Sequence, residues 1–138
     1  MPDRTRCEAE IESLHEFFVD WYAGERDEDD FDRLERALTP GFEMVTPDGV
    51  RRDRAAVLEG IRESYGRDEP GAFDIAIRNV ELIRRVDDHA TVRYEEWQET
   101  DGETTGRIST VLFRERPDAP GGLTWVDLHE TWLEGNEV

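Results

Sequence analysis

The chain contains no lysine, only one cysteine and no long apolar run. The lone Cys7 cannot form an internal disulfide, and the three histidines stand at no spacing, with Cys7 or with one another, that is typical of a metal site. Without an apolar run of about 20 residues, no segment is predicted to span a membrane. The N-terminal segment is charged, so we expect no signal peptide and a cytoplasmic protein. We also expect no metal and no organic cofactor.

The charge of the chain is strongly one-sided. It carries 35 Asp and Glu against 17 basic residues, all of them Arg, and its formal net charge is −18. Such a surface repels nucleic-acid phosphates and anionic lipids, which disfavours nucleic-acid-binding and membrane-surface roles. Abundant carboxylates without lysine resemble the proteins of halophilic archaea, whose acidic surfaces stay hydrated in concentrated salt. We therefore attribute the charge to habitat rather than to function.

The first half of the chain has the apolar spacing of helices. The length of 138 residues predicts one domain, residues 1–138. Apolar side chains recur at intervals of three and four, which predicts helices over residues 7–23, 31–38 and 54–65. Asp53 is a candidate N-cap for the third helix. A short strand over Phe42–Thr46 precedes that helix.

The second half has the pattern of long strands. Extended segments cover residues 72–86, 89–100, 107–116 and 123–133. The connections between them are short and rich in turn residues, so neighbouring strands should be antiparallel. In the first of these strands Val80 breaks the alternation of the preceding apolar residues, which predicts a β-bulge near Arg78 and Asn79. The predicted fold class is α+β.

This order of elements, together with two segments, resembles the nuclear transport factor 2-like superfamily. "LTPGFEMVTPDG" is similar to a segment of its polyketide-cyclase-like and ketosteroid-isomerase-like members. "WVDLHETWL" is similar to the closing strand of kinase association domains, with Thr131 where a second His often stands. The resemblance implies a cone in which three N-terminal helices pack on a curved antiparallel sheet. Because the superfamily contains isomerases, dehydratases, cyclases, epoxide hydrolases and assembly modules, the fold alone implies no activity.

Strand alternation predicts which side chains face the inside of the cone. On the last strand the more apolar set, Val126, Leu128, Glu130 and Trp132, is assigned to the concave face. On the strand before 107–116 we expect Arg93, Glu95 and Trp97 inside, although a bulge would reverse them. The predicted ligand-binding residues, including two from the helices, are Trp21, Tyr65, Glu95, Trp97, Arg107, Ser109, Glu130 and Trp132.

Three functions remain open for this predicted site. The leading hypothesis is binding of a small, largely apolar ligand in a pocket with a few charged groups. The second is cofactor-free acid–base catalysis such as isomerisation, dehydration, cyclisation or hydrolysis, with Glu95 or Glu130 as acid or base and Arg107 stabilising negative charge. The third is an assembly module without a ligand, in which Arg107 forms a structural ion pair with the carboxylates.

The opposite face of the sheet is predicted to bind a second copy of the chain. It would carry more apolar surface than a soluble monomer leaves in water. Members of the superfamily that this chain resembles often pair through this face, so we expect a homodimer. The predicted interface residues are Tyr94, Leu112, Trp125, Asp127 and His129. We interpret Asp127 and His129 as interface hydrogen-bonding groups rather than a catalytic pair.

Overall fold

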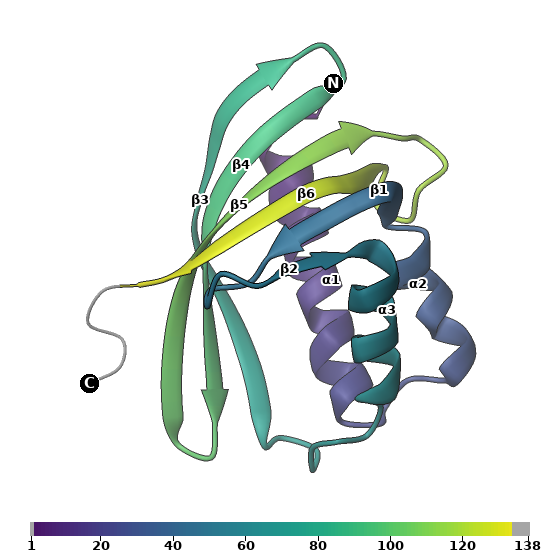
Figure 1. The fold of residues 1–138 in the computed structure, drawn as a ribbon, viewed down its shortest axis with the longest axis vertical. Helices are drawn as coiled ribbons and strands as arrows, with labels where there is room; N and C mark the ends of the chain where they lie inside the picture. Colours follow the sequence, from purple (N-terminus) through teal and green to yellow (C-terminus); the bar gives the residue numbers. More distant parts are fainter. Residues whose placement is uncertain (1, 134–138) are drawn as a thin grey trace.

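Three helices lie on one side of a strongly curved six-stranded sheet (Figure 1). A computed structural model describes residues 2–133. In chain order the elements are α1 (Arg4–Tyr22), a 3₁₀ turn η1 (Glu28–Phe31), α2 (Asp32–Glu35), β1 (Leu38–Val45), β2 (Arg51–Asp53), α3 (Arg54–Glu63), β3 (Phe73–Val86), β4 (His89–Thr100), β5 (Glu103–Glu115) and β6 (Leu123–Trp132). The predicted α+β class, with helices packed on a curved sheet, is confirmed. None of the described helices has the length and apolar character needed to cross a membrane.

The sheet is mixed rather than purely antiparallel. Its strand order is β2-β1-β6-β5-β4-β3. Strands β3 to β6 pair in sequence as antiparallel neighbours, as predicted, but β1 lies parallel to β6. No hairpin joins β1 to β6, so no turn dictates their relative direction. Strand β2, which pattern analysis missed, adds a three-residue antiparallel edge to β1.

Helix α1 begins three residues before its predicted start, because Asp3 caps it. The Asp3 carboxylate accepts the backbone N–H of Arg6 at 2.9 Å. The helix turns one stripe toward the sheet, and three residues of that stripe, Cys7, Glu10 and His15, are ionisable. Its buried residues are Cys7, Glu10, Ile11, Leu14, His15, Phe17 and Trp21.

The second predicted helix lies three residues earlier in the chain than expected. It consists of η1 and α2 and ends at Glu35, and β1 begins at Leu38 rather than at Phe42. The N–H of Trp125 donates to the carbonyl of Ala37 at 2.7 Å, and Leu38 pairs with Trp125 in the sheet. Pairing with β6 therefore extends the chain where apolar spacing alone predicted another helical turn.

Helix α3 starts where the sequence predicts. The side chain of Asp53 accepts the N–H of Ala56 at 2.9 Å, as expected of an N-cap. The helix ends at Glu63, two residues before the predicted end. It packs beside β1 and β2, which places one of its faces over the open side of the curved sheet.

Two irregularities in the strands decide which side chains face the helices. The predicted bulge in β3 is confirmed: the register shifts after Arg78, and Asn79 has a φ of 54°, which Asn tolerates better than most residues. A second bulge, in β6, was not expected. Leu112 pairs with Asp127 and Phe113 with Trp125, so Val126 is the extra residue.

The assignment of faces on β4 is corrected by the structure. Val92, Tyr94 and Glu96 are buried on the concave side, and Glu95 and Trp97 lie on the convex side with Arg93. The β4–β5 register puts Tyr94 beside Ser109, and this pairing forces the alternate residues outward. The convex side has room for the Trp97 ring because the residue below it is a glycine, Gly106.

Candidate functional site

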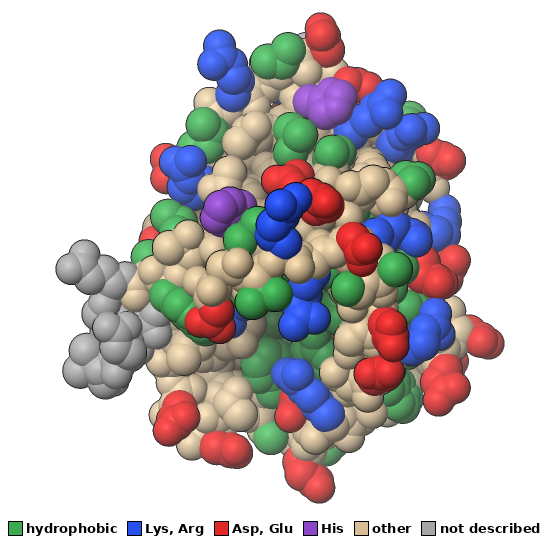
Figure 2. Space-filling view, in the orientation of Figure 1, with side chains coloured by type: hydrophobic (Ala, Val, Ile, Leu, Met, Phe, Trp, Pro, Cys, Tyr) green, Lys and Arg blue, Asp and Glu red, His purple; other side chains and the backbone are tan. Residues whose placement is uncertain are grey.

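A pocket opens between the concave face of the sheet and helices α1 and α3. Its volume is about 350 Å³. Figure 2 shows its opening as a hollow floored by hydrophobic side chains, with arginines at its edge. Its apolar wall includes Leu14, Phe18, Tyr22, Leu38, Phe42, Met44, Val57, Ile61, Phe73, Trp125 and Leu128. Its ionisable lining residues are His15, Arg52, Arg67, Glu96, Arg107 and Glu130.

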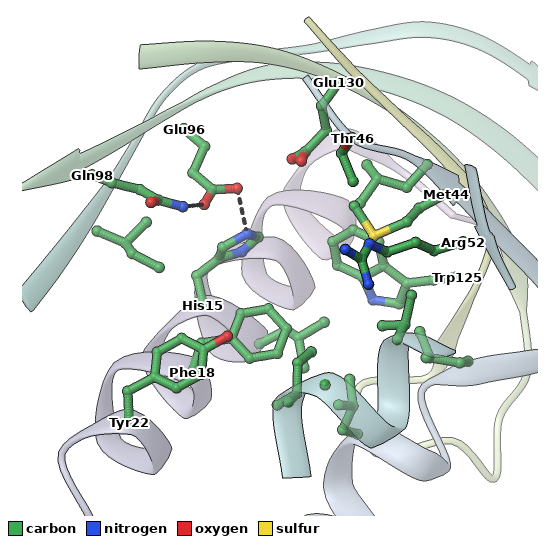
Figure 3. Close-up of a pocket in the computed structure, with 18 of the residues that line it drawn as sticks. His15, Phe18, Tyr22, Met44, Thr46, Arg52, Glu96, Gln98, Trp125 and Glu130 are labelled. Carbon is green, nitrogen blue, oxygen red and sulfur yellow. Dashed lines mark hydrogen bonds and ion pairs between the residues drawn. The ribbon is translucent and has the colours of Figure 1, made fainter. Parts of the chain in front are cut away.

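A buried histidine–glutamate pair forms one wall of this pocket (Figure 3). His15 Nε2 lies 3.0 Å from Glu96 Oε1, and both side chains are more than nine-tenths buried. His15 Nδ1 lies 2.7 Å from the carbonyl oxygen of Ile11. Gln98 donates to the other Glu96 oxygen at 2.6 Å. The pair thus connects α1 to β4 across the cone.

These contacts favour the ionised form of the pair. A carbonyl and a carboxylate are both acceptors, so each nitrogen of His15 carries a proton and the ring is an imidazolium. Burial disfavours that charge, but the charge and hydrogen bond of Glu96 outweigh it and raise the pKa of His15 above 6.5. Burial also opposes ionisation of Glu96, but the His15 charge and hydrogen bond lower its pKa to about 2.

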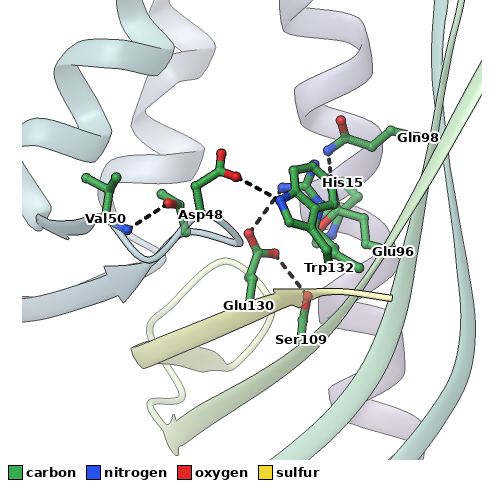
Figure 4. Close-up of polar contacts among 10 residues, drawn as sticks. His15, Asp48, Val50, Glu96, Gln98, Ser109, Glu130 and Trp132 are labelled. Atoms are coloured by element: carbon green, nitrogen blue, oxygen red, sulfur yellow. Dashed lines mark hydrogen bonds and ion pairs between the residues drawn. The ribbon is translucent and has the colours of Figure 1, made fainter. Parts of the chain in front are cut away.

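A second carboxylate, Glu130 on β6, lines the same pocket and is only 4% exposed. Arg107 on β5 donates to Glu130 Oε1 at 3.3 Å, and the hydroxyl of Ser109 donates to Oε2 at 3.0 Å (Figure 4). Burial and the negative charge of Glu96 nevertheless raise the pKa of Glu130 above 4.5. The pocket therefore holds two carboxyl groups whose pKa values are shifted in opposite directions.

The guanidinium of Arg107 is held from two sides. It contacts Glu130 on one side, and its Cζ lies 4.8 Å from the centre of the Trp132 ring on the other. The Trp132 indole donates to Asp48, in the β1–β2 turn, at 2.9 Å (Figure 4). Among the described residues, the buried Nε of Arg107 has no hydrogen-bond partner.

The structure brings together half of the predicted ligand-binding residues. Arg107 and Glu130 line the pocket, Ser109 supports Glu130, and Trp132 stacks on Arg107. Trp21 and Tyr65 do not line it. Their rings pack edge to face in the helical layer, 4.6 Å apart, and the Trp21 indole donates to a backbone carbonyl of α3.

Glu95 and Trp97 are not part of the pocket, because β4 presents the opposite parity. The Trp97 indole donates to Glu95 at 3.0 Å on the convex side, where Arg78 approaches the Trp97 ring. The expected convergence of Glu95 with Glu130 and Arg107 is therefore wrong. Glu96 occupies the place that the sequence analysis assigned to Glu95.

Two of the five predicted interface residues also face the wrong way for that role. Tyr94 and Trp125 are almost fully buried on the concave side. The Trp125 indole donates to Glu10 on α1 at 2.9 Å, and Arg33 holds Glu10 from the other side at 2.8 Å. The bulge at Val126 turns Trp125 inward. Leu112, Asp127 and His129 remain on the convex face, where the two polar residues are exposed.

Two other buried groups of reactive type are the Cys7 thiol and the Tyr94 hydroxyl. Burial raises the pKa of the Cys7 thiol to about 11, with Asp3 adding to the shift, so this thiol is a poor nucleophile. The Tyr94 hydroxyl is buried close to Ser109 but makes no hydrogen bond of regular geometry among residues 2–133. Burial and the charges of Glu96 and Glu130 raise its pKa well above 10. In the same range no cluster of three His, Cys, Asp or Glu could hold a metal ion.

Three residues of the site, His15, Glu96 and Gln98, were not predicted from the sequence. His15 stands on the apolar stripe of α1, between Leu14 and Phe18, and this position was the available signal that its ring is buried. Glu96 and Gln98 share the parity of Val92, so a correct assignment of β4 would have placed both inside. A buried imidazole needs partners, and the partner lies 81 residues away in the chain.

Solved structures with the same fold define the class of protein. A nuclear transport factor 2-like protein of unknown function from Pseudomonas aeruginosa is 34% identical and superposes with a TM-score of 0.83, covering 93% of this chain and 98% of that one. The CaMKII hub of S. rosetta has a TM-score of 0.68 at 17% identity, over 91% of this chain and 95% of the hub, and so shows the fold alone. The predicted nuclear transport factor 2-like cone is confirmed.

Sequence comparison identifies the family within this class. The family described as sucrose-6-phosphate phosphohydrolase C-terminal matches residues 9–134, and the chain belongs to it. Sucrose-phosphatase 1 of Nicotiana tabacum is 27% identical over 129 residues. That match covers 91% of this chain and 30% of the phosphatase, so the chain spans less than a third of its curated relative.

Proposed function

We propose that the chain binds a small, largely apolar organic molecule in the pocket between the sheet and helices α1 and α3. The observation that carries the proposal is the pocket itself: about 350 Å³ of space that the described side chains leave unfilled. Ligand sites of about 300–1,000 Å³ with mostly apolar walls and a few polar groups are the usual kind in proteins. Arg107 and Glu130, which both line the pocket, supply such polar groups.

A pocket-filling substitution in α3 tests this proposal. Gly60 lines the pocket, and a Cβ placed there meets no atom within 4 Å. Gly60→Phe should therefore fill the pocket without distorting the helix. Gly60→Ala is the matched control, since both variants remove a helical glycine, which stabilises a helix by about 0.5–1 kcal/mol.

The measurement is titration with the neutral fluorophore 1-aminoanthracene. The unmodified chain and Gly60→Ala should bind one molecule each with similar affinity. Gly60→Phe should bind at least about tenfold more weakly, a difference of about 1.4 kcal/mol, while keeping its far-ultraviolet circular dichroism. Absence of saturable binding to the unmodified chain, or equal binding to all three proteins, would contradict the proposal.

A second candidate function, proton-transfer catalysis, is favoured by the opposed pKa shifts of Glu96 and Glu130. Glu96 is held ionised by His15, whereas the pKa of Glu130 is raised. Paired carboxyls with divergent pKa values are characteristic of acid–base sites. In this proposal Glu130 removes a proton next to a carbonyl group, and the guanidinium of Arg107 stabilises the resulting oxyanion. Glu95 has no role in it.

Hydrogen–deuterium exchange of a simple ketone tests this candidate. With 2-octanone in D₂O, nuclear magnetic resonance should show protein-catalysed exchange of the protons next to the carbonyl. The rate should rise with pH through the raised pKa of Glu130, because only the carboxylate accepts a proton. Glu130→Gln should abolish the exchange, and Glu95→Gln on the convex face should retain it. Exchange that survives in Glu130→Gln, or that is absent from the unmodified chain, would refute this candidate.

Self-association through the convex face stays a prediction. The CaMKII hub shows that the fold occurs in a protein named as a hub, although at 17% identity. Three predicted interface residues, Leu112, Asp127 and His129, do lie on that face. We propose a homodimer through this surface, in addition to the ligand pocket rather than in place of it.

A further inference from the structure

We propose that the ligand is a carboxylic acid with an apolar body, whose carboxylate binds Arg52 at the mouth of the pocket. This inference rests on the proposed ligand-binding function and adds the chemical class of the ligand. It follows from the balance of charges around the pocket, which differs from that of the whole chain.

The residues that line the pocket have an excess of positive charge, whereas the whole chain has an excess of negative charge. The whole sequence has about two acidic residues for each basic one. The pocket lining, in contrast, contains three arginines and the imidazolium of His15 against only two carboxyl groups. At physiological salt, charges are screened beyond about 8 Å. A ligand inside the pocket is therefore governed by the lining residues rather than by the net charge of −18.

Three of the four cations already have partners. His15 is paired with Glu96 at 3.0 Å, and Arg107 contacts Glu130 at 3.3 Å. The Nε of Arg67 lies 3.2 Å from Asp68, and its guanidinium also covers the ring of Tyr22. These partners offset the charge of each cation, and an incoming anion gains little from displacing them.

Arg52 is the cation that remains. Within residues 2–133 its guanidinium has no hydrogen-bond or ion-pair partner. Figure 3 shows the side chain extending from β2 toward the middle of the pocket. Its neighbour Arg51, in contrast, lies 3.8 Å from Glu43. One unpaired guanidinium balances one negative charge, and its planar donors match the two oxygens of a carboxylate.

The apolar part of the ligand has a defined place. The pocket beyond Arg52 is walled by Met44, Leu128 and the aliphatic residues of α3, which offer hydrocarbon contact. The resulting ligand is amphipathic, with an anionic head at the open end and a hydrophobic body in the interior. A phosphate monoester shares the anionic head but carries up to two charges, so it fits a single free guanidinium less well.

Displacement of bound 1-aminoanthracene tests this inference with four competitors of the same chain length: octanoate, octyl phosphate, 1-octanol and octylamine. Octanoate should displace the probe at about tenfold lower concentration than 1-octanol, which corresponds to one charge-assisted hydrogen-bonded contact. Octyl phosphate should be intermediate, and octylamine weakest. Stronger displacement by octyl phosphate than by octanoate would overturn the assignment to a carboxylate.

Two variants test whether the preference for octanoate over 1-octanol depends on Arg52. Arg52→Gln should bring octanoate to within about twofold of 1-octanol while leaving 1-octanol and 1-aminoanthracene binding unchanged. Arg51→Gln removes the same charge from the neighbouring position and should preserve the preference for octanoate. Equal displacement by octanoate and 1-octanol, or equal effects of the two variants, would overturn the inference while leaving the pocket established. Failure of 1-aminoanthracene to bind at all would instead refute the proposed function.

Discussion

Two histidine–carboxylate pairs in this protein have nearly the same length and very different surroundings. His15 and Glu96 meet at 3.0 Å inside the cone, with side chains 7% and 6% exposed. His89 and Asp88 meet at 2.8 Å in the β3–β4 turn, with side chains 40% and 44% exposed. The distance alone would rank the two contacts as equals. Burial separates them, since water solvates the exposed pair whether or not its members touch.

The difference shows what holds the concave wall together. A buried ion pair gains little over a well-packed apolar pair, but removal of one partner leaves an uncompensated charge in a poorly solvated place. Among residues 2–133, only His15 and Gln98 form hydrogen bonds with the Glu96 carboxylate. The inside of the cone is therefore sensitive to single substitutions, whereas exposed pairs tolerate them.

The largest expected effect comes from breaking the buried pair. His15→Leu should lower the free energy of unfolding by about 3–5 kcal/mol, because it leaves Glu96 buried without its cation. The double variant His15→Leu/Glu96→Leu should recover most of that loss, since no unpaired charge remains. Urea denaturation followed by tryptophan fluorescence measures both. His89→Gln is the matched control and should leave the unfolding midpoint unchanged. Equal losses of unfolding free energy in the single and double variants would show that His15 stabilises the protein through packing and not through its charge.

The pH dependence of stability should separate the two pairs as well. The raised pKa of His15 means that its contribution is complete below pH 6.5 and declines as the pH rises through the folded-state value. The lowered pKa of Glu96 means that its contribution is complete above pH 4.5 and is lost as the pH falls toward about 2. Both contributions are present together between these limits.

Comparison of the unmodified chain with His15→Leu/Glu96→Leu across pH 3–9 checks this window. The difference in free energy of unfolding, unmodified minus variant, should be greatest between pH 4.5 and 6.5 and should shrink on both sides. A difference that is constant with pH would show that the pair is not ionised in the folded state.

The convex face has its own sensitive point, where Trp97 covers Gly106. A Cβ at Gly106 would lie 2.6 Å from the Trp97 ring, so Gly106→Ala must displace the indole. We expect a loss of about 1–3 kcal/mol, the usual effect of overpacking. Gly41→Ala in β1 is the control, because a Cβ there meets nothing within 4 Å. Addition of Trp97→Ala to Gly106→Ala should remove the clash. If the losses of unfolding free energy in the two single variants simply added up in the double variant, the proposed clash between position 106 and the Trp97 ring would be wrong.

The concave and convex faces of the sheet show which structural features could be predicted from the sequence pattern. Apart from the three-residue strand β2, the elements and their order could be predicted, because apolar spacing of three to four and of two distinguishes helices from strands over long segments. The bulge at Asn79 could be predicted because it interrupts a clear alternation. Local signals of this kind were also sufficient for the cap at Asp53.

The parity of β4 and the inward orientation of Trp125 on β6 could not be predicted in the same way. On β4, Tyr94 and Trp97 are both large and aromatic yet stand on opposite faces, so hydrophobicity alone does not choose between them. Gly106 decides the matter, because the missing side chain on β5 makes room for Trp97. On β6, Trp125 turns inward through a one-residue bulge and finds Glu10 as an acceptor. Both causes are contacts between distant parts of the chain.

The smallest expected change in folding stability, with the clearest effect on assembly, is at Leu112. This half-buried residue faces outward, opposite Asp127. Leu112→Arg avoids a like-charge pair with Asp127 and should alter the unfolding free energy by only about 0.5 kcal/mol. If the convex face joins two copies, the new charge should shift the protein from dimer to monomer in sedimentation velocity experiments.

Ile83→Arg on the outer strand β3 makes the same chemical change at a side chain that is 44% exposed, and it should leave the dimer intact. A monomeric unmodified chain at 100 µM, or a dimer that persists in Leu112→Arg, would remove the convex face as an interface. In that case the exposed Asp127 and His129 would be ordinary solvated residues. The two faces would then differ in a single respect, with buried ionic contacts within the cone and solvated polar groups outside it.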